Sequence, residues 1–510
     1  MANTKTLTQH AYLNTVANLL NYVVTMIVWL VVNPLLLSYL GSSLFGTWKY
    51  CQRLLSYAEA ADGRATQALK WTLANKLVSD DTDAKRRDIG CALGVWLRFL
   101  PFLLLLGGFL SWISPYLIRG LPDEHFVLAR LACTLLVLNV ILMPLQSIPE
   151  SVLIGMNVSY KGFGARVFSI VLTGSLMVCA VFIGWSIIGV AASLVCATLS
   201  QGIILTYIVK RNFPWVGVSK PGKKEFHKFF SFSVWIFAWT FVARFILGGD
   251  VIVLGWITSP EMVTSYVFTI YAIQMIIGFI GFAVGGATPG LGGLVGQKQF
   301  EKASAVRSEI MVNSWLLTTI IGSMVLLWNY SFVKLWVGTE QFVGFTETLL
   351  MVLLVMQLIF IRNDGFIIDL TLRLKWKVLL GIFSCVISAI LAYIFAVKFS
   401  SSVIGLVVGF ITGRAILTIA YPMIVSNAFE IKNKQHLIPI IRPIIMTIIF
   451  FGVSYYLGKT IEVNGWFSLI AYATVSLVLL TVSMFFIGLS QHQREKVMMR
   501  IRSINFMGRS

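Results

Sequence analysis

Charged residues are scarce in this sequence. Asp, Glu, Lys and Arg make up 12% of the 510 residues, whereas hydrophobic residues make up 57%. Soluble domains carry about twice that share of charge. Apolar stretches of about twenty residues recur along the chain, and this is the length that an α-helix needs to cross a bilayer. The sequence therefore predicts a polytopic membrane protein of helical rather than barrel patterning.

Motifs that carry catalysis are lacking. The five histidines lie near span ends or in loops, and none has a Cys or carboxylate at metal-ligand spacing. No GxSxG motif occurs, and the string closest to a phosphate-binding loop, Gly452 to Thr460, has one residue too many between its glycines. The six cysteines fall inside predicted spans, where we expect core packing. We expect no catalytic residues, no metal site, no cofactor and no enzyme activity.

Negative charge is also rare, so the formal net charge is +19. With fourteen spans and both termini in the cytoplasm, most of the 40 Lys and Arg residues fall in cytoplasmic segments. This bias is typical of a multi-pass membrane protein that contacts anionic lipid head groups. It argues against nucleic acid as a partner.

The first span, Tyr12 to Tyr39, carries polar residues at the i, i+4, i+7, i+11 spacing of one helix face. They are Asn14, Asn18, Asn21 and Thr25. Such a stripe indicates either a lumen-facing side or hydrogen bonds between helices, and both interpretations stay open. Pro34 predicts a kink near the outer end of the span.

The next stretch, Leu40 to Arg64, is long enough to cross the bilayer and yet is charged. On a helical wheel one face collects Lys49, Arg53, Ser56, Tyr57, Arg64 and Gln67, whereas Glu59 and Asp62 turn away. A central Arg or Lys that faces lipid costs about 2.5 to 3.5 kcal/mol. We therefore expect Arg53 to face a bundle interior or a wet cavity, whereas Lys49, near the membrane surface, could also snorkel.

Later spans add further charges. Arg98 lies in the third span, and Arg130 lies so close to the outer end of the fourth that snorkelling is the better interpretation. Arg244 and Asp250 share the seventh span but are about 240° apart around the helix, so they cannot pair with each other.

A basic segment with a Pro221–Gly222 break predicts the boundary between two halves. We expect spans 1–6 in residues 1–209, a cytoplasmic linker in 210–229, spans 7–12 in 230–426, and two more spans with an amphipathic cytoplasmic tail in 427–510. The predicted fold is all-α with about 14 transmembrane helices, in which two parallel six-helix lobes surround a central cavity.

The eighth span ends in a glycine-rich stretch, with eight glycines and Pro289 between Gly278 and Gly296. Glycines at this spacing allow close helix packing. Glycine beside proline also makes a helix easy to bend, which a moving gate would use. Gly285, Gly286 and Pro289 are the candidate hinge.

Several strings resemble one family. NPLLLSYLGSSLFGTW and the later Asp62-Gly63 resemble the first hairpin of Wzx-type polysaccharide flippases, a branch of the multidrug/oligosaccharidyl-lipid/polysaccharide exporter (MOP) superfamily. The matching positions of the first string are Pro34, Leu40, Gly41, Phe45, Gly46 and Trp48. GDVIVLGWITSPEMVTSY, with Asp250, resembles span 7 of that family, GLVGQKQFEKA the segment after span 8, and FVKLWVG the outer end of span 9. Arg64 departs from the pattern, because it makes this end of the span more basic.

The resemblance implies alternating-access translocation of undecaprenyl-diphosphate-linked oligosaccharide from the cytoplasmic to the outer leaflet of a bacterial inner membrane, for O-antigen-like polysaccharide. A polymerase and a chain-length regulator are the protein partners we consider. A cationic lumen suits a diphosphate, because Arg binds phosphate oxygens bidentately. The candidate substrate-binding residues are Lys49, Arg53, Arg64, Arg98, Arg244, Asn18 and Asn21, and Glu59, Asp62 and Asp250 are candidates for coupling to Na⁺ or H⁺.

Other functions stay open. A cation-coupled multidrug exporter of the same superfamily should have an acidic cavity, yet arginines outnumber carboxylates in the spans. The arginines are Arg53, Arg64, Arg98, Arg130, Arg244 and Arg414, and the carboxylates are Glu59, Asp62 and Asp250. A non-transporting assembly partner of polysaccharide polymerisation would use its polar stripes only to join helices. A major-facilitator transporter fits less well, because ADGRATQALK echoes its span 2 to 3 loop only loosely.

Overall fold

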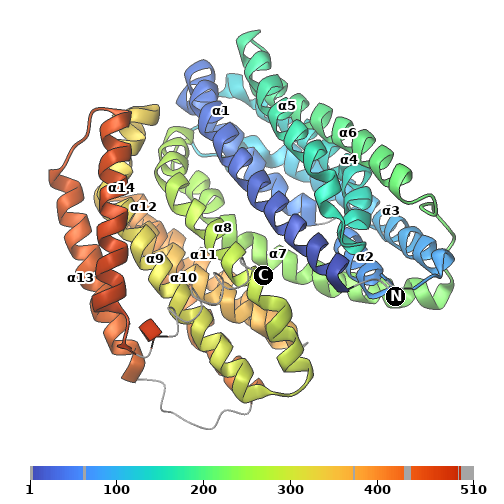
Figure 1. Ribbon diagram of the computed structural model, residues 1–510. Coiled ribbons are helices and arrows are strands. Elements are labelled where there is room, and N and C mark those ends of the chain that lie inside the picture. Colours follow the sequence, from blue (N-terminus) through green and yellow to red (C-terminus); the bar gives the residue numbers. More distant parts are fainter. Residues whose placement is uncertain are drawn as a thin grey trace. The chain divides into compact units, whose positions relative to one another are not determined.

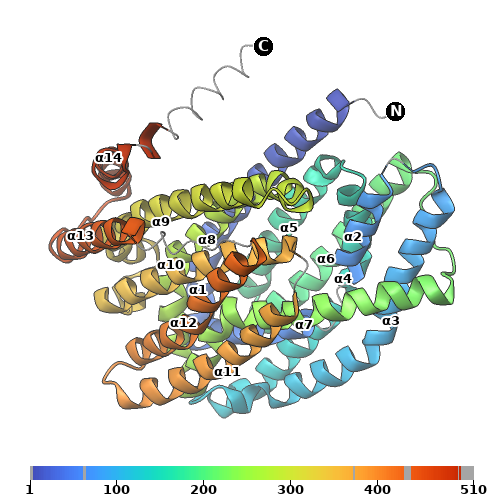
Figure 2. The same ribbon diagram turned by 90° about the horizontal axis from the view of Figure 1, so that it is seen from below.

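The computed structural model describes residues 4–60, 65–77, 79–371, 374–429, 438–491 and 493–495, and within these ranges every regular element is a helix (Figures 1 and 2). The α-helices are α1 (Thr4–Ala60), α2 (Ala65–Asn75), α3 (Thr82–Ile113), α4 (Phe126–Gly155), α5 (Phe163–Phe182), α6 (Ser186–Asn212), α7 (Lys223–Ile257), α8 (Pro260–Gly296), α9 (Phe300–Val337), α10 (Phe345–Leu370), α11 (Leu374–Lys398), α12 (Ser402–Ala428), α13 (Ile438–Thr460) and α14 (Trp466–Ser483). Short helical turns are η1 (Ser114–Leu117), η2 (Asp123–His125), η3 (Ser159–Gly162), η4 (Thr339–Gln341) and η5 (Met484–Gly488).

The number of membrane crossings agrees with the sequence. Twelve helices in the described part are long and apolar enough to span a bilayer. The first, Tyr12–Ala58, has 47 residues and contains two crossings. α8 is a further candidate, because it has 37 residues and only Glu261 is charged. The prediction of an all-α polytopic fold with about fourteen spans is confirmed.

α1 is a hairpin of two helical arms. Gly41 has φ 71° and ψ 170°, which glycine adopts readily and other residues avoid. Lys49 Nζ donates a hydrogen bond of 3.0 Å to Asn33 Oδ1. In a straight helix these residues, sixteen positions apart, would be separated by about 24 Å. The chain therefore reverses at Gly41, and the second arm, which holds the predicted cationic face, runs antiparallel to the first.

The chain forms two compact units, residues 1–264 and 265–510. α7 belongs to the first unit by its contacts, because it packs along the second arm of α1 and against α2 and α3. The two lobes predicted from the sequence, with a boundary in residues 210–229, are a division into two six-helix halves and not a division by contacts. They stay a prediction.

In the first unit, α4 and α5 both pack against α6, and these three helices lie side by side in Figure 1. The short helix α2 lies on α4 and α3 by one apolar face. Its buried residues Ala65, Ala68, Leu69 and Leu73 follow helical spacing. They join the buried cluster that also contains residues of α3, α4 and α6.

In the second unit, α11 and α12 approach so closely that glycine is required at their contact (Figure 2). A Cβ on Gly405 would lie 2.3 Å from Phe395 O, and one on Gly409 would lie 2.3 Å from Ala392 Cα. Gly413 continues the four-residue spacing against Ser388 Cα, at 2.4 Å. Small residues at this spacing let membrane helices touch. The sequence reading noticed glycines in α8 but missed these.

The expectation that all six cysteines lie in the core is wrong for two of them. Cys51, Cys91 and Cys133 are buried and Cys385 is half-buried, but Cys179 and Cys196 are exposed. A free cysteine is apolar enough to face lipid, so an apolar span places it on either side of a helix.

Candidate functional site

Lys49 lies within the α1 hairpin. Besides its bond to Asn33, which is 4% exposed, its ammonium lies 5.1 Å from the ring centroid of Phe45 and 5.7 Å from that of Trp29. Aromatic ring faces attract cations. Lys49 therefore points between the two arms of the hairpin rather than extending to the membrane surface, as the snorkelling interpretation had it.

Arg53 fits a notch in α7. A Cβ on Gly248 would lie 3.2 Å from Arg53 Nη1 and 3.5 Å from its Cζ, so the guanidinium lies where a side chain of α7 would be. One heptad along α7, Gly255 receives the ring of Tyr50, whose Cδ2 would be 2.4 Å from a Cβ. These contacts set the antiparallel register of α7 on the second arm of α1.

The register continues toward the other end of α7. Tyr57 packs edge-on against Phe241, with ring centroids 5.3 Å apart. Arg244 is half-buried one helical turn before Gly248, on the face that receives Arg53. The structure thus brings Arg53 and Arg244 to one side of α7, and Asp250 is buried on the same helix, 5% exposed.

Arg98 forms a cation–aromatic platform at α3. Its guanidinium carbon lies 3.8 Å from the ring centroid of Phe226, and the ring lies in a notch at Gly94, where a Cβ would be 3.0 Å from Cε2. Phe230 stacks on Phe226 with centroids 6.1 Å apart. Arg98 is exposed and has no ion-pair partner in the described part of the chain. Its N–H edges can therefore donate to an anion.

Other predicted residues have structural contacts. Arg130 lies in the first turns of α4, and its Nη2 donates to Tyr116 Oη at 3.1 Å; its snorkelling stays a prediction. Asn14 bonds the turn at Asn157, at 2.9 Å, so it joins elements instead of facing a lumen. Asn18 is exposed and Asn21 is half-buried, and the carbonyl of Asn21 accepts a bond of 2.7 Å from Thr25.

Some predicted residues lie outside the described parts. Asp62 and Arg64 are not among the described residues, and the same holds for most of the predicted amphipathic tail. Glu59 lies in helix α1, and Gly285, Gly286 and Pro289 lie in helix α8, where the backbone is described and the side chains are not. The ion-coupling and hinge roles of these residues stay predictions.

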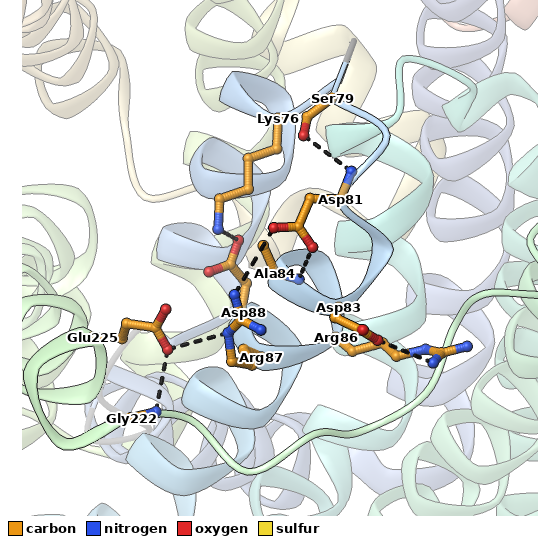
Figure 3. A network of polar contacts seen from close by, with 10 residues as sticks. All are labelled: Lys76, Ser79, Asp81, Asp83, Ala84, Arg86, Arg87, Asp88, Gly222 and Glu225. Atoms are coloured by element: carbon orange, nitrogen blue, oxygen red, sulfur yellow. Dashed lines mark hydrogen bonds and ion pairs between the residues drawn. The ribbon is translucent and has the colours of Figure 1, made fainter.

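A network of charges ties the start of α7 to α2 and α3 (Figure 3). Arg87 Nε lies 3.3 Å from Glu225 Oε2, and the same oxygen accepts a bond of 3.1 Å from the backbone N–H of Gly222. Lys76 forms an ion pair of 2.7 Å with Asp88. These contacts fix the N-terminal end of α7 within the first unit.

The segment predicted as a linker lies on α3. Arg86 Nε donates to Trp215 O at 2.6 Å, and the ammonium of Lys85, only 4% exposed, lies 5.5 Å from the ring centroid of Trp215. A Cβ on Gly90 would lie 2.0 Å from Ser219 O, so backbone contacts backbone here. Residues 215–219 are therefore part of the first unit's packing.

The sequence analysis missed a polar cluster in the second unit, at the C-terminal end of α10. The helix continues to Leu370 through RNDGFIID. Arg307 of α9 binds Asp364 through two bonds of 2.7 and 2.9 Å. Asn363 donates to Ser314 of α9 at 2.7 Å. The polar residues stay helical because partners on α9 satisfy them.

A second ion pair, in which only the lysine is buried, follows on the same helix. Lys377 Nζ of α11 donates to Asp369 Oδ1 at 2.6 Å, and the Lys377 side chain is 1% exposed. Tyr421 of α12 donates to the Lys377 carbonyl at 3.1 Å. Among the described residues no three His, Cys, Asp or Glu side chains form a metal-binding group.

Comparisons with known proteins found one family model and several solved structures. A family model described as polysaccharide biosynthesis protein matches residues 94–292. The solved structure of the lipid II flippase MurJ in an inward closed conformation matches with a TM-score of 0.66, 12% identity and coverage of 92% of this chain and 98% of that one. An inward-facing multidrug resistance MATE family transporter of the MOP superfamily matches with a TM-score of 0.59, 14% identity and coverage of 80% and 96%.

A third match is a MOP superfamily transporter from Pyrococcus furiosus, described as having a binding pocket of reverse polarity. Its TM-score is 0.55, with 14% identity and coverage of 83% of this chain and 96% of that one. No curated protein matches the sequence. The three matched structures are described as transporters or as a flippase. The resemblance predicted from the sequence is thus confirmed: the chain has the fold of the MOP superfamily, and its residues 94–292 match the polysaccharide biosynthesis family.

Proposed function

We propose that this protein is a flippase that moves a saccharide linked to a lipid diphosphate from the cytoplasmic to the outer leaflet. The observation that carries the proposal is the Arg98 platform. A guanidinium inside a membrane-spanning helix is costly unless a partner binds it. Arg98 has no carboxylate partner in the described part of the chain, and its stacking on Phe226 leaves the N–H edges accessible.

A diphosphate fits this chemistry. Its oxygens accept paired hydrogen bonds from a planar guanidinium, and the charge-assisted bonds are stronger than neutral ones. Lys49 and Arg53 lie one helical turn apart on the second arm of the α1 hairpin. Arg53 packs against the side of α7 that carries Arg244. We infer that these cations form further positions for the same head group.

The matches to a polysaccharide biosynthesis family and to a lipid II flippase support a sugar-bearing lipid as the substrate. We extend the proposal to undecaprenyl diphosphate as the carrier, a bacterial inner membrane with both termini in the cytoplasm, and O-antigen-like polysaccharide as the product. A polymerase and a chain-length regulator would act on the exported unit.

The membrane potential can drive this export. An inside-negative potential favours outward movement of an anionic head group by about 2.3 kcal/mol per charge per 100 mV. Coupling to Na⁺ or H⁺ through Glu59, Asp62 or Asp250 is the alternative. Transport that persists with a potential but without either ion gradient would rule out a coupling role for all three residues.

A cation-coupled multidrug exporter is the second candidate, because MATE transporters share the fold. Arg98 and Lys49 would repel cationic drugs, which favours the anionic lipid.

The experiment reconstitutes the purified protein in vesicles that contain an undecaprenyl-diphosphate-linked disaccharide. A membrane-impermeant glycosidase added outside cleaves only the outer-leaflet share in protein-free vesicles. We expect it to cleave nearly all of the lipid when the protein is present. Cleavage limited to the outer leaflet, together with outward movement of ethidium in the same vesicles, would favour the drug exporter.

A further inference from the structure

Arg362 differs from the other charged residues of its neighbourhood. It lies in α10, eight residues before the end of the helix at Leu370 and inside the candidate span Phe345–Leu370. Asp364 and Asp369 beside it are both paired, with Arg307 and Lys377. Arg362 is half-buried and has no ion pair and no hydrogen bond in the described part of the chain.

The guanidinium of Arg362 lies between one ring and one helix backbone. Its carbon is 5.7 Å from the ring centroid of Phe366, one turn further along α10. On the other side, a Cβ on Gly281 of α8 would lie 3.6 Å from Nη2. Gly281 presents no side chain to the guanidinium, and outside the neighbouring turns of α8 only Nη2, among the described atoms, lies within 4 Å of the place that a Cβ would take.

No residue of α8 can neutralise Arg362. The only charged residue of that helix is Glu261, twenty positions from Gly281 and therefore about 30 Å away along the axis. Residues 282–290 of this helix contain no charged residue.

Snorkelling does not account for this position. Arg362 lies about 12 Å before the end of α10, measured along the axis. A snorkelling arginine extends its guanidinium toward the membrane surface. Here the guanidinium instead contacts Phe366 and the backbone of α8. An unpaired arginine at such a place is a binding-site hypothesis by default.

We propose that Arg362 is an anion-binding residue of the second unit and that it takes a phosphate of the lipid-diphosphate head group. The identity of the ligand rests on the proposed function. A planar guanidinium can donate two parallel hydrogen bonds to phosphate oxygens, and no carboxylate of the described residues takes these bonds in Arg362. The ring of Phe366, 5.7 Å from the guanidinium carbon, adds a cation–aromatic attraction.

The test measures binding of undecaprenyl diphosphate to the purified full chain in phosphatidylcholine nanodiscs. We expect R362Q to weaken binding about tenfold or more, because hydrogen bonds to charged groups are involved. R362K should recover only part of the affinity, because it loses the paired geometry. R442Q, which changes an exposed arginine of the same unit, should bind like the wild type.

A second pair of variants changes the space beside Gly281 and leaves every charged residue in place. G281A should bind normally, because its Cβ would meet the guanidinium at ordinary contact distance. G281L should fill the place of the phosphate and weaken binding as R362Q does. G293L on the same helix enters open space and should have no effect.

Control ligands distinguish the loss of a phosphate site from a general loss of affinity for the lipid. Inorganic pyrophosphate should compete with the lipid in the wild type and compete less well in R362Q, whereas undecaprenol, which lacks phosphate, should bind all variants equally. If R362Q and G281L bind the diphosphate lipid as tightly as the wild type does, the role of Arg362 is overturned and the proposed function stands. A wild type that binds no diphosphate lipid would overturn both.

Discussion

The packing of α7 on α1 can be tested by adding one methyl group. In Gly255→Ala the new Cβ would lie 2.4 Å from two carbons of the Tyr50 ring. Tyr50 is fully buried, so its ring has no solvent space to enter and the helices must separate. Overpacking of this kind costs about 1 to 3 kcal/mol. Alanine returns about 1 kcal/mol of helix propensity, so the expected net loss is about 0 to 2 kcal/mol.

Two matched substitutions give the scale. In Gly248→Ala the Cβ meets the flexible end of Arg53 at 3.2 Å, so a small shift of the guanidinium relieves the contact. In Gly108→Ala of α3 the Cβ meets nothing within 4 Å. The apparent melting temperature in detergent should therefore be lowest for Gly255→Ala, intermediate for Gly248→Ala, and equal to or above the wild type for Gly108→Ala.

A double mutant identifies the cause. Tyr50→Leu removes the ring that the new methyl group meets, so Gly255→Ala should cost less in that background than in the wild type. Contacting residues show interaction free energies of about 0.5 to 3 kcal/mol in such cycles. Equal melting temperatures for Gly255→Ala and Gly108→Ala, or strict additivity with Tyr50→Leu, would refute the register of α7 on α1.

Three further predictions concern charge and hinge residues. Arg307→Ala leaves the buried Asp364 without its partner, which should cost about 3 to 5 kcal/mol of stability. A double variant, Arg307→Leu with Asp364→Leu, removes both charges and should melt close to the wild type. If Gly285 and Gly286 are a hinge, replacing both by Leu should stop transport in vesicles while membrane insertion stays normal, and unchanged transport would exclude the hinge. Arg53→Ala should lower transport per folded molecule. Arg53→Lys should keep transport only if charge, rather than paired hydrogen bonding, matters. Full activity of Arg53→Ala at normal stability would remove Arg53 from the site.

The sequence predicted the features that depend on local pattern. The lengths of the apolar stretches gave the spans, because any helix that crosses a bilayer needs about twenty apolar residues. The division of the chain into a span from Tyr12 to Tyr39 and a second crossing stretch from Leu40 to Arg64 agrees with the reversal at Gly41. Helical spacing also put Lys49 and Arg53 on one face, where the structure has them in contact with the hairpin and with α7.

Features that depend on partners distant in the chain could not be predicted. Residues 362–369 look too polar for a span, but α9 and α11 supply partners for Asn363, Asp364 and Asp369. Arg98 and Phe226 lie 128 positions apart, and no local pattern connects them. The GxxxG spacing at Gly405, Gly409 and Gly413 was a local signal, and it could have predicted the contact with α11.

The central claim is that an anionic head group is selected by the cations of the spans. The most direct test compares outward movement of three lipids that carry the same disaccharide and prenyl chain, joined through a diphosphate, a monophosphate or a neutral ether. We predict that the wild type moves the diphosphate lipid fastest and the neutral lipid slowest, and that Arg98→Gln lowers the ratio of these two rates while its melting temperature stays that of the wild type. Equal rates for all three lipids, or a ratio that Arg98→Gln leaves unchanged, would contradict the account.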